Sequence, residues 1–133
     1  MGRRRRAVRL GAEDKRILAD MPADERVSAE YKRLRELYAK VEGGRLRLVL
    51  KLIARAAFMA VTLGELEAHI AQHGCTEEYQ NGANQKGKKK SSEVDVYNVM
   101  VKNYAAVIRQ LTELLPKEEA GGEDGFDAHK AAR

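Results

Sequence analysis

The sequence predicts an all-α fold in which a long antiparallel helical hairpin packs with one N-terminal helix. Three observations predict it. The 133 residues include only two prolines, so long stretches are free to be helical. Ten of the eleven glycines fall in the two ends, a junction at 43–44 and a central stretch at 74–87. Between these zones, apolar residues recur at helical intervals of three and four.

The predicted organisation is one helical domain between two non-helical ends. Residues 1–22 are expected to be a flexible basic arm, residues 23–115 the helical domain, and residues 116–133 a disordered tail. The tail is net acidic and rich in glycine and alanine, a composition that buries too little apolar surface to fold. The chain is long enough for one ordinary domain and too short for two.

The first predicted helix runs from about residue 23 to residue 41. Pro22 precedes it, which suits the start of a helix, and Gly43-Gly44 is expected to end it. One apolar stripe along this helix is predicted to face the core: Val27, Tyr31, Leu34, Leu37 or Tyr38, and Val41.

The second predicted helix spans residues 45–73. Its first eight residues alternate like a strand, but the continuation keeps helical spacing for seven turns. A helix of this length measures about 43 Å, more than a chain of this size needs to enclose its own core. Apolar residues also lie off its main stripe, among them Leu48, Leu52, Phe58 and Met59. Part of this helix is therefore expected to pack on more than one neighbour.

The third predicted helix covers residues 93–115 and ends before Pro116. Ser92 is the expected N-cap, and Asp95 lies where a carboxylate meets the positive helix end. Its apolar residues form a heptad-like seam about 35 Å long. This helix is therefore expected to pair with the second in an antiparallel hairpin and to form the core with it.

The stretch 74–92 between these two helices is predicted to be a basic loop, either functional or mobile. Residues 82–89 come close to a phosphate-binding loop, G-x-x-x-x-G-K-[ST]. Lys89, however, stands where a hydroxyl should hold magnesium, and no strand is expected before the motif. A basic solvated loop is the preferred interpretation.

No catalytic constellation is visible. His69 and His73 share a helix face near Cys75, but no fourth ligand is evident, and histidines near a helix C-terminus are favourable without a metal. No nucleophile, base and orienting group occur together. The sequence therefore predicts a protein that is not an enzyme and that carries no metal and no cofactor.

Clustered positive charge is the most informative signal. The chain has a net charge of +5, and residues 1–16 alone carry a surplus of that size. Such clusters neutralise phosphates and release counterions, whereas no aromatic residue is interleaved for base stacking. The predicted DNA contacts are Arg3, Arg4, Arg5, Arg6, Arg9, Arg47, Lys51, Arg55, Lys86, Lys88, Lys89 and Lys90.

Membrane and secretory signals are not evident. No stretch without a charge is longer than residues 56–64, and that length is far too short to span a bilayer. The N-terminal arginines are not followed by the apolar segment of a secretory signal. The sequence therefore predicts an intracellular protein with no membrane partner.

Residues 78–98 read E-Y-Q-N-G-A-N-Q-K-G-K-K-K-S-S-E-V-D-V-Y-N, and the chain continues to Leu114-Leu115-Pro116. This stretch resembles the small subunit of bacteriophage terminase. It is similar to the helical class in which a Gly/Asn-rich loop leads into a K-S-x-E-V-x-V-Y-N helix ending near Leu-Leu-Pro. The resemblance covers residues 60–116, about half of the chain.

The resemblance implies a non-enzymatic component of a viral genome-packaging motor. Its expected partners are double-stranded viral DNA, other copies of itself in a ring, and the terminase large subunit, which owns the ATPase and the nuclease. In such a ring the expected contacts between copies are Leu48, Leu52, Phe58 and Met59. Its expected location is the cytoplasm of the infected bacterial host. The alternative is a helical scaffold or adaptor protein whose basic arm binds an acidic protein.

Overall fold

The computed structural model describes residues 9–80, 82 and 85–115. Its elements, in chain order, are α1 (Ala12–Ala19), α2 (Glu25–Leu37), α3 (Gly44–His73), β1 (Thr76–Gln80), β2 (Lys86–Lys90) and α4 (Ser92–Glu113). The predicted, mostly helical fold is confirmed, but the two strands show that the chain is not all-α.

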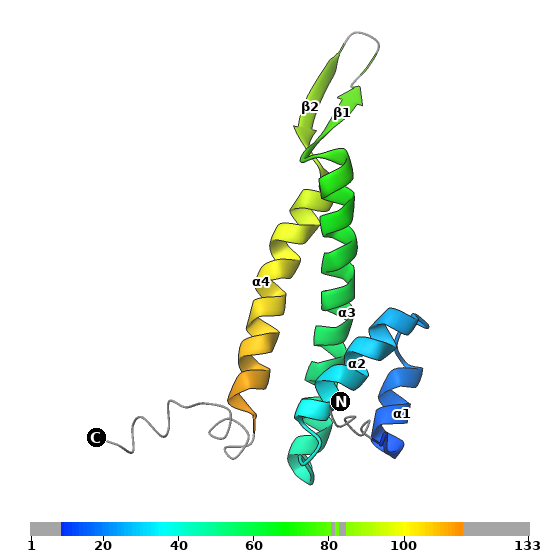
Figure 1. Cartoon of the computed structure of the whole chain (residues 1–133). Helices are drawn as coiled ribbons and strands as arrows, with labels where there is room; N and C mark the ends of the chain where they lie inside the picture. Colours follow the sequence, from blue (N-terminus) through cyan, green and yellow to red (C-terminus); the bar gives the residue numbers. More distant parts are fainter. Residues whose placement is uncertain (1–8, 81, 83–84, 116–133) are drawn as a thin grey trace, which may run out of the picture.

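The long helix α3 is the spine of the molecule (Figure 1). Helices α1 and α2 pack on its first half, and α4 runs back along it in the antiparallel direction. The two strands extend beyond the end of α3 as an antiparallel ribbon. The predicted helical hairpin of residues 45–73 and 93–115 is therefore present, with a ribbon at its tip.

The core lies at one end of this hairpin. Buried side chains of α2 and of the first half of α3 dominate it, and α4 adds one from its last turn: Val27, Tyr31, Leu34, Tyr38, Val49, Leu50, Ile53, Ala56, Ala57 and Leu111. The core was predicted along most of the hairpin, but it is confined to the end of the hairpin away from the ribbon. Among the described residues, Leu63 is the one buried apolar side chain of the hairpin half next to the ribbon.

Helix α1 corrects the prediction of a flexible arm over residues 1–22. Residues 12–19 are helical, and the buried Asp14 joins this helix to α2. Its carboxylate accepts hydrogen bonds from the Tyr31 hydroxyl at 2.8 Å and from Arg35 Nε at 2.9 Å. Ile17 and Leu18 of the same helix pack against the core. Residues 1–8 and 116–133, the rest of the arm and the tail, lie outside the described residues.

The first predicted helix, 23–41, is shorter in the structure. Asp24 is the N-cap of α2, and its carboxylate accepts a hydrogen bond from the Arg26 amide at 2.8 Å. The helix ends at Leu37, well before the glycine pair. Gly43 has a φ of +75° just before α3, a conformation that favours glycine. The pair therefore starts the next helix instead of ending this one.

Most of the stretch predicted as a loop, 74–92, is a β-ribbon, with strands at residues 76–80 and 86–90, and Ser92 already belongs to α4. Thr76 pairs with Lys90 at its base and Gln80 with Lys86 toward its tip. Opposite charges face one another across the strands, with Glu77 across from Lys89 and Glu78 across from Lys88, an arrangement that stabilises antiparallel pairs.

Candidate nucleic-acid interface

The ribbon has two chemically different faces. Side chains alternate between the faces of a strand, so the register decides which of them lie together. One face, called here the lysine face, carries Lys86, Lys88 and Lys90 with Thr76, Glu78 and Gln80. The opposite face carries Glu77, Tyr79, Gly87 and Lys89. Three of the four predicted lysines therefore share one side.

The lysine face carries a net charge of +2 and is exposed along its length. Lys90 forms an ion pair with Asp95 of α4, with 3.0 Å between Nζ and Oδ1. Lys86 and Lys88 take part in no ion pair with any residue that the structure describes. These two ammonium groups are thus available to an anionic ligand.

The opposite face is electrically balanced. Lys89 Nζ lies 3.4 Å from Glu77 Oε1. The Tyr79 ring lies against Gly87, where an added Cβ would come within 2.8 Å of ring atoms. Gly87 is therefore the small residue that lets this ring lie close to the ribbon backbone. A polyanion is therefore attracted more strongly to the lysine face than to this one.

Ser91 joins the ribbon to α4. Its backbone amide donates to the Cys75 carbonyl at 2.9 Å and continues the strand pairing. Its buried side chain caps α4 by accepting a hydrogen bond from the Glu93 amide at 3.1 Å, and its hydroxyl donates to Glu93 Oε2 at 2.8 Å. The predicted N-cap, Ser92, is exposed and is the first residue of the helix.

The hydrogen bond from the Ser91 hydroxyl is the main reason that the pKa of Glu93 lies below its usual value. His69 of α3 lies on the other side of this carboxylate, with 3.7 Å between Nε2 and Oε1. The Ser91–Glu93 pair thus holds a negative charge at the positive end of α4.

The histidine pair considered for a metal lies beside this junction. The rings of His69 and His73 have centroids 4.4 Å apart, and Cys75 is exposed. In the described part of the chain, no three His, Cys, Asp or Glu side chains come together in an arrangement that could hold a metal ion. A strand, β1, does precede the near match to a phosphate-binding loop, so the expectation that none does is wrong. Residues 86–90 of the motif are themselves a strand, however, and not a loop that opens a helix.

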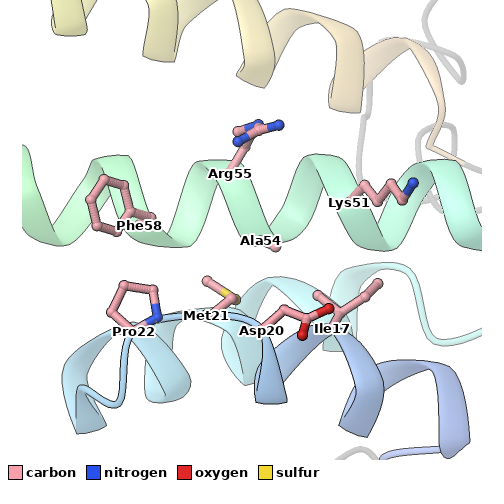
Figure 2. Close-up of a pocket in the computed structure, with 8 residues that line it drawn as sticks. All are labelled: Ile17, Asp20, Met21, Pro22, Lys51, Ala54, Arg55 and Phe58. Carbon is pink, nitrogen blue, oxygen red and sulfur yellow. The ribbon is translucent and has the colours of Figure 1, made fainter.

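The predicted basic stripe on α3 lies far from the ribbon, in the first half of the helix. Arg47 forms an ion pair with Glu13 of α1, with 3.2 Å between Nη2 and Oε1. Lys51 and Arg55 line a groove of about 470 Å³ between α3 and the α1–α2 segment (Figure 2). The other lining residues are Ile17, Asp20, Met21, Pro22, Ala54 and Phe58. Within the described part of the chain, the predicted DNA contacts are thus divided between the ribbon and the opposite end of the molecule.

Of the predicted N-terminal DNA contacts, the structure describes Arg9, which is exposed. The other four, Arg3, Arg4, Arg5 and Arg6, lie outside the described residues. Arg9 precedes α1, and Glu13 of that helix pairs with Arg47 near the start of α3. Arg9 therefore belongs to the end of the molecule opposite the ribbon (Figure 1).

The predicted oligomer contacts are divided by the fold. Leu48 and Phe58 are 54% and 41% exposed, whereas Leu52 packs against the core of its own chain. Met59 lines a second, largely apolar groove with Val96, Val99 and Met100 of α4. Val96 and Val99 were not among the predicted oligomer contacts, because the prediction considered only the regular apolar seam of their helix. Their place off that seam was the signal that could have marked them as exposed apolar residues.

Comparisons with protein-family models, curated proteins and solved structures found no match for this chain. None of the described helices is both long enough and apolar enough to cross a membrane.

Proposed function

We propose that this chain is a non-enzymatic, duplex-DNA-binding component of a viral genome-packaging motor, of the kind represented by terminase small subunits. In this role it recognises the packaging site on viral DNA as an oligomeric ring in the cytoplasm of the infected bacterium. It also regulates the large subunit that carries the ATPase and the nuclease.

The observation that carries the proposal is the lysine face, displayed at the tip of the helical hairpin. Lysines at every second residue of a strand recur about every 7 Å along one side, and they neutralise phosphates in a sequence-independent way. A two-stranded ribbon also has the width that the major groove of B-DNA admits, about 12 Å. The ribbon therefore offers both charge and a shape that fits duplex DNA.

The test compares the two faces of the ribbon. In the full chain, Lys86→Gln with Lys88→Gln is expected to weaken binding to a labelled duplex. The slope of log K against log salt should fall by about 1 for each phosphate that the variant no longer neutralises. Fluorescence anisotropy between 50 and 200 mM salt measures both the affinity and the slope. The matched comparison is between the single variants Lys88→Gln and Lys89→Gln, because each removes one charge, from opposite faces of the ribbon.

Equal slopes for the Lys88→Gln and Lys89→Gln single variants would exclude the lysine face as the contact surface. No binding by the wild-type chain would overturn the proposal itself and favour the adaptor alternative.

The oligomeric part of the proposal rests on exposed apolar surface. Val96 and Val99 are 48% and 62% exposed beside Met59, and burying such a patch between copies stabilises an assembly. Val99→Asp is expected to lower the oligomer mass in native mass spectrometry, with the helical circular dichroism unchanged. Asn103→Asp is the control. Asn103 lines the same groove, and this change adds the same charge without removing apolar surface. An oligomer that resists Val99→Asp would exclude this patch.

A further inference from the structure

The groove between α3 and the α1–α2 segment combines an apolar lining with charge. Ile17, Met21, Pro22, Ala54 and Phe58 supply the apolar surface, and Figure 2 shows Phe58 of α3 facing the chain at Pro22. Phe58 is 41% exposed, although it lies close to the buried Ala57. An exposed aromatic ring in an open groove leaves room for a second apolar side chain.

The charges of this groove favour a peptide over duplex DNA. Lys51 and Arg55 line the groove from α3, with the guanidinium of Arg55 turned away from Asp20 in Figure 2, and Asp20 supplies one anion from the opposite wall. A DNA backbone presents phosphates and no apolar side chain to fill such a groove. A peptide that carries an aromatic residue between carboxylates matches both the apolar lining and the two cations.

The chain itself contains such a segment. Residues 123–127 read Glu-Asp-Gly-Phe-Asp, and Phe126 is the one aromatic residue in the sequence outside residues 9–115. Lys130 follows four residues later and offers a partner for Asp20.

The length of chain that follows α4 is sufficient for this contact. Leu115 packs against the same core as Ile17, Met21 and Ala54 of the groove. Phe126 follows Leu115 by eleven residues, which span up to about 36 Å when extended. One helix is about 10–12 Å across, so this length is enough to pass around α3 within one chain.

We propose that residues 123–127 dock in this groove of their own chain. Phe126 lies against Phe58 and Met21, and the carboxylates of Asp124 and Asp127 face Lys51 and Arg55. The contact covers two of the cations that the sequence predicted as DNA contacts.

The test uses the two phenylalanines of the chain, Phe58 and Phe126, as fluorine reporters. The full-length protein labelled with 4-fluorophenylalanine is expected to give two ¹⁹F resonances. Phe126→Ala removes one of them and is expected to shift the other, that of Phe58. Glu118→Gln, which changes tail charge outside the segment, is the control and is expected to leave Phe58 unmoved.

A charge exchange tests the ionic part. Arg55→Glu is expected to move the Phe126 resonance toward that of a synthetic peptide of residues 116–133, and adding Asp127→Arg is expected to move it back. Carbodiimide coupling of Lys51 to Asp124 or Asp127, in an equal mixture of ¹⁴N and ¹⁵N chains, is expected to give cross-links within single chains.

A Phe58 resonance that ignores Phe126→Ala overturns the proposal. Cross-links found only between ¹⁴N and ¹⁵N chains also overturn it, because another copy then fills the groove. No DNA is present in these experiments, so their outcome is separate from that of the proposed function.

Discussion

At the scale of single residues, Asp14 shows how one buried charge fixes a helix. The side chain is 1% exposed, and besides Tyr31 and Arg35 it accepts a hydrogen bond from the Gly11 amide at 3.0 Å. Burial opposes its ionisation. The three hydrogen bonds and the charge of Arg35 outweigh burial and hold the pKa of Asp14 below its usual value. Arg35 in turn donates to the Tyr38 carbonyl at 2.8 Å, so the carboxylate links the start of α1 to the end of α2.

Asp14→Asn is expected to destabilise the protein at pH 7 by about 3–5 kcal/mol, because it leaves the buried guanidinium without its counter-charge. Since the folded-state pKa is depressed, the contribution of this carboxylate is fully present above the unfolded value of 3.8 and is lost as the pH falls through the lower folded value. Urea unfolding followed by circular dichroism at pH 7 and near pH 3 measures the difference.

The gap in unfolding free energy between wild type and Asp14→Asn should therefore shrink toward the acid end. Asp20→Asn, an exposed change close to α1, is the control and is expected to stay within about 0.5 kcal/mol of wild type at pH 7. A gap for Asp14→Asn that is equal at both pH values would contradict the assigned role.

At the scale of elements, the sequence predicted the helices whose buried residues follow an apolar period. It missed the elements that polar pairs hold in place. Helix α3 was predicted almost to the residue because its buried positions repeat every three or four residues. Helix α1 was missed because its most deeply buried residue is an aspartate, which in the sequence counts as surface charge.

The ribbon was missed because its strands have no apolar face. Its stabilising pairs join residues that are distant in sequence, such as Glu77 and Lys89. The signal that could have found it is Asn81-Gly82, a dipeptide typical of hairpins. The lysines of the candidate site were named from charge alone, but their division between two faces needs the strand register.

The N-terminal cap of α4 gives the prediction at this scale. Ser91→Ala is expected to destabilise the protein by about 0.5–2 kcal/mol, because it removes the buried acceptor for the Glu93 amide. Ser92→Ala is the matched control, since that exposed hydroxyl makes only a long contact of 3.4 Å with Glu77. Thermal unfolding of both variants measures the effect. Equal losses would show that the cap energy does not reside in Ser91.

At the scale of the whole molecule, stability is unevenly distributed. The core holds α2, the first half of α3 and the last turn of α4, whereas the distal half of the hairpin buries Leu63 among the described residues. Polar contacts such as the hydrogen bond from the Tyr97 hydroxyl to Glu67, 3.0 Å long, contribute to the distal half. Regions with few buried apolar contacts open locally at lower free energy than the core.

Leu63→Ala is therefore expected to speed amide hydrogen exchange in residues 60–73 and 92–103 while leaving residues 49–57 close to wild type. Hydrogen exchange measured by mass spectrometry under native conditions tests this. Ala56→Gly, a change within the buried core, is the comparison and is expected to speed exchange in residues 49–57 as well. Equal acceleration of both halves by Leu63→Ala would show that the hairpin opens as one cooperative unit.

The length of α3 fixes the minimum length of a DNA duplex that can contact both ends of the molecule. Its 30 residues correspond to about 45 Å, and they separate the ribbon from Arg9 and the start of the spine. At about 3.4 Å per base pair, this is the length of about 13 base pairs, more than one full turn of B-DNA. For a chain that binds DNA as proposed, a duplex lying along α3 must exceed this footprint before one copy engages it at both ends, so affinity should rise in a step with duplex length rather than smoothly.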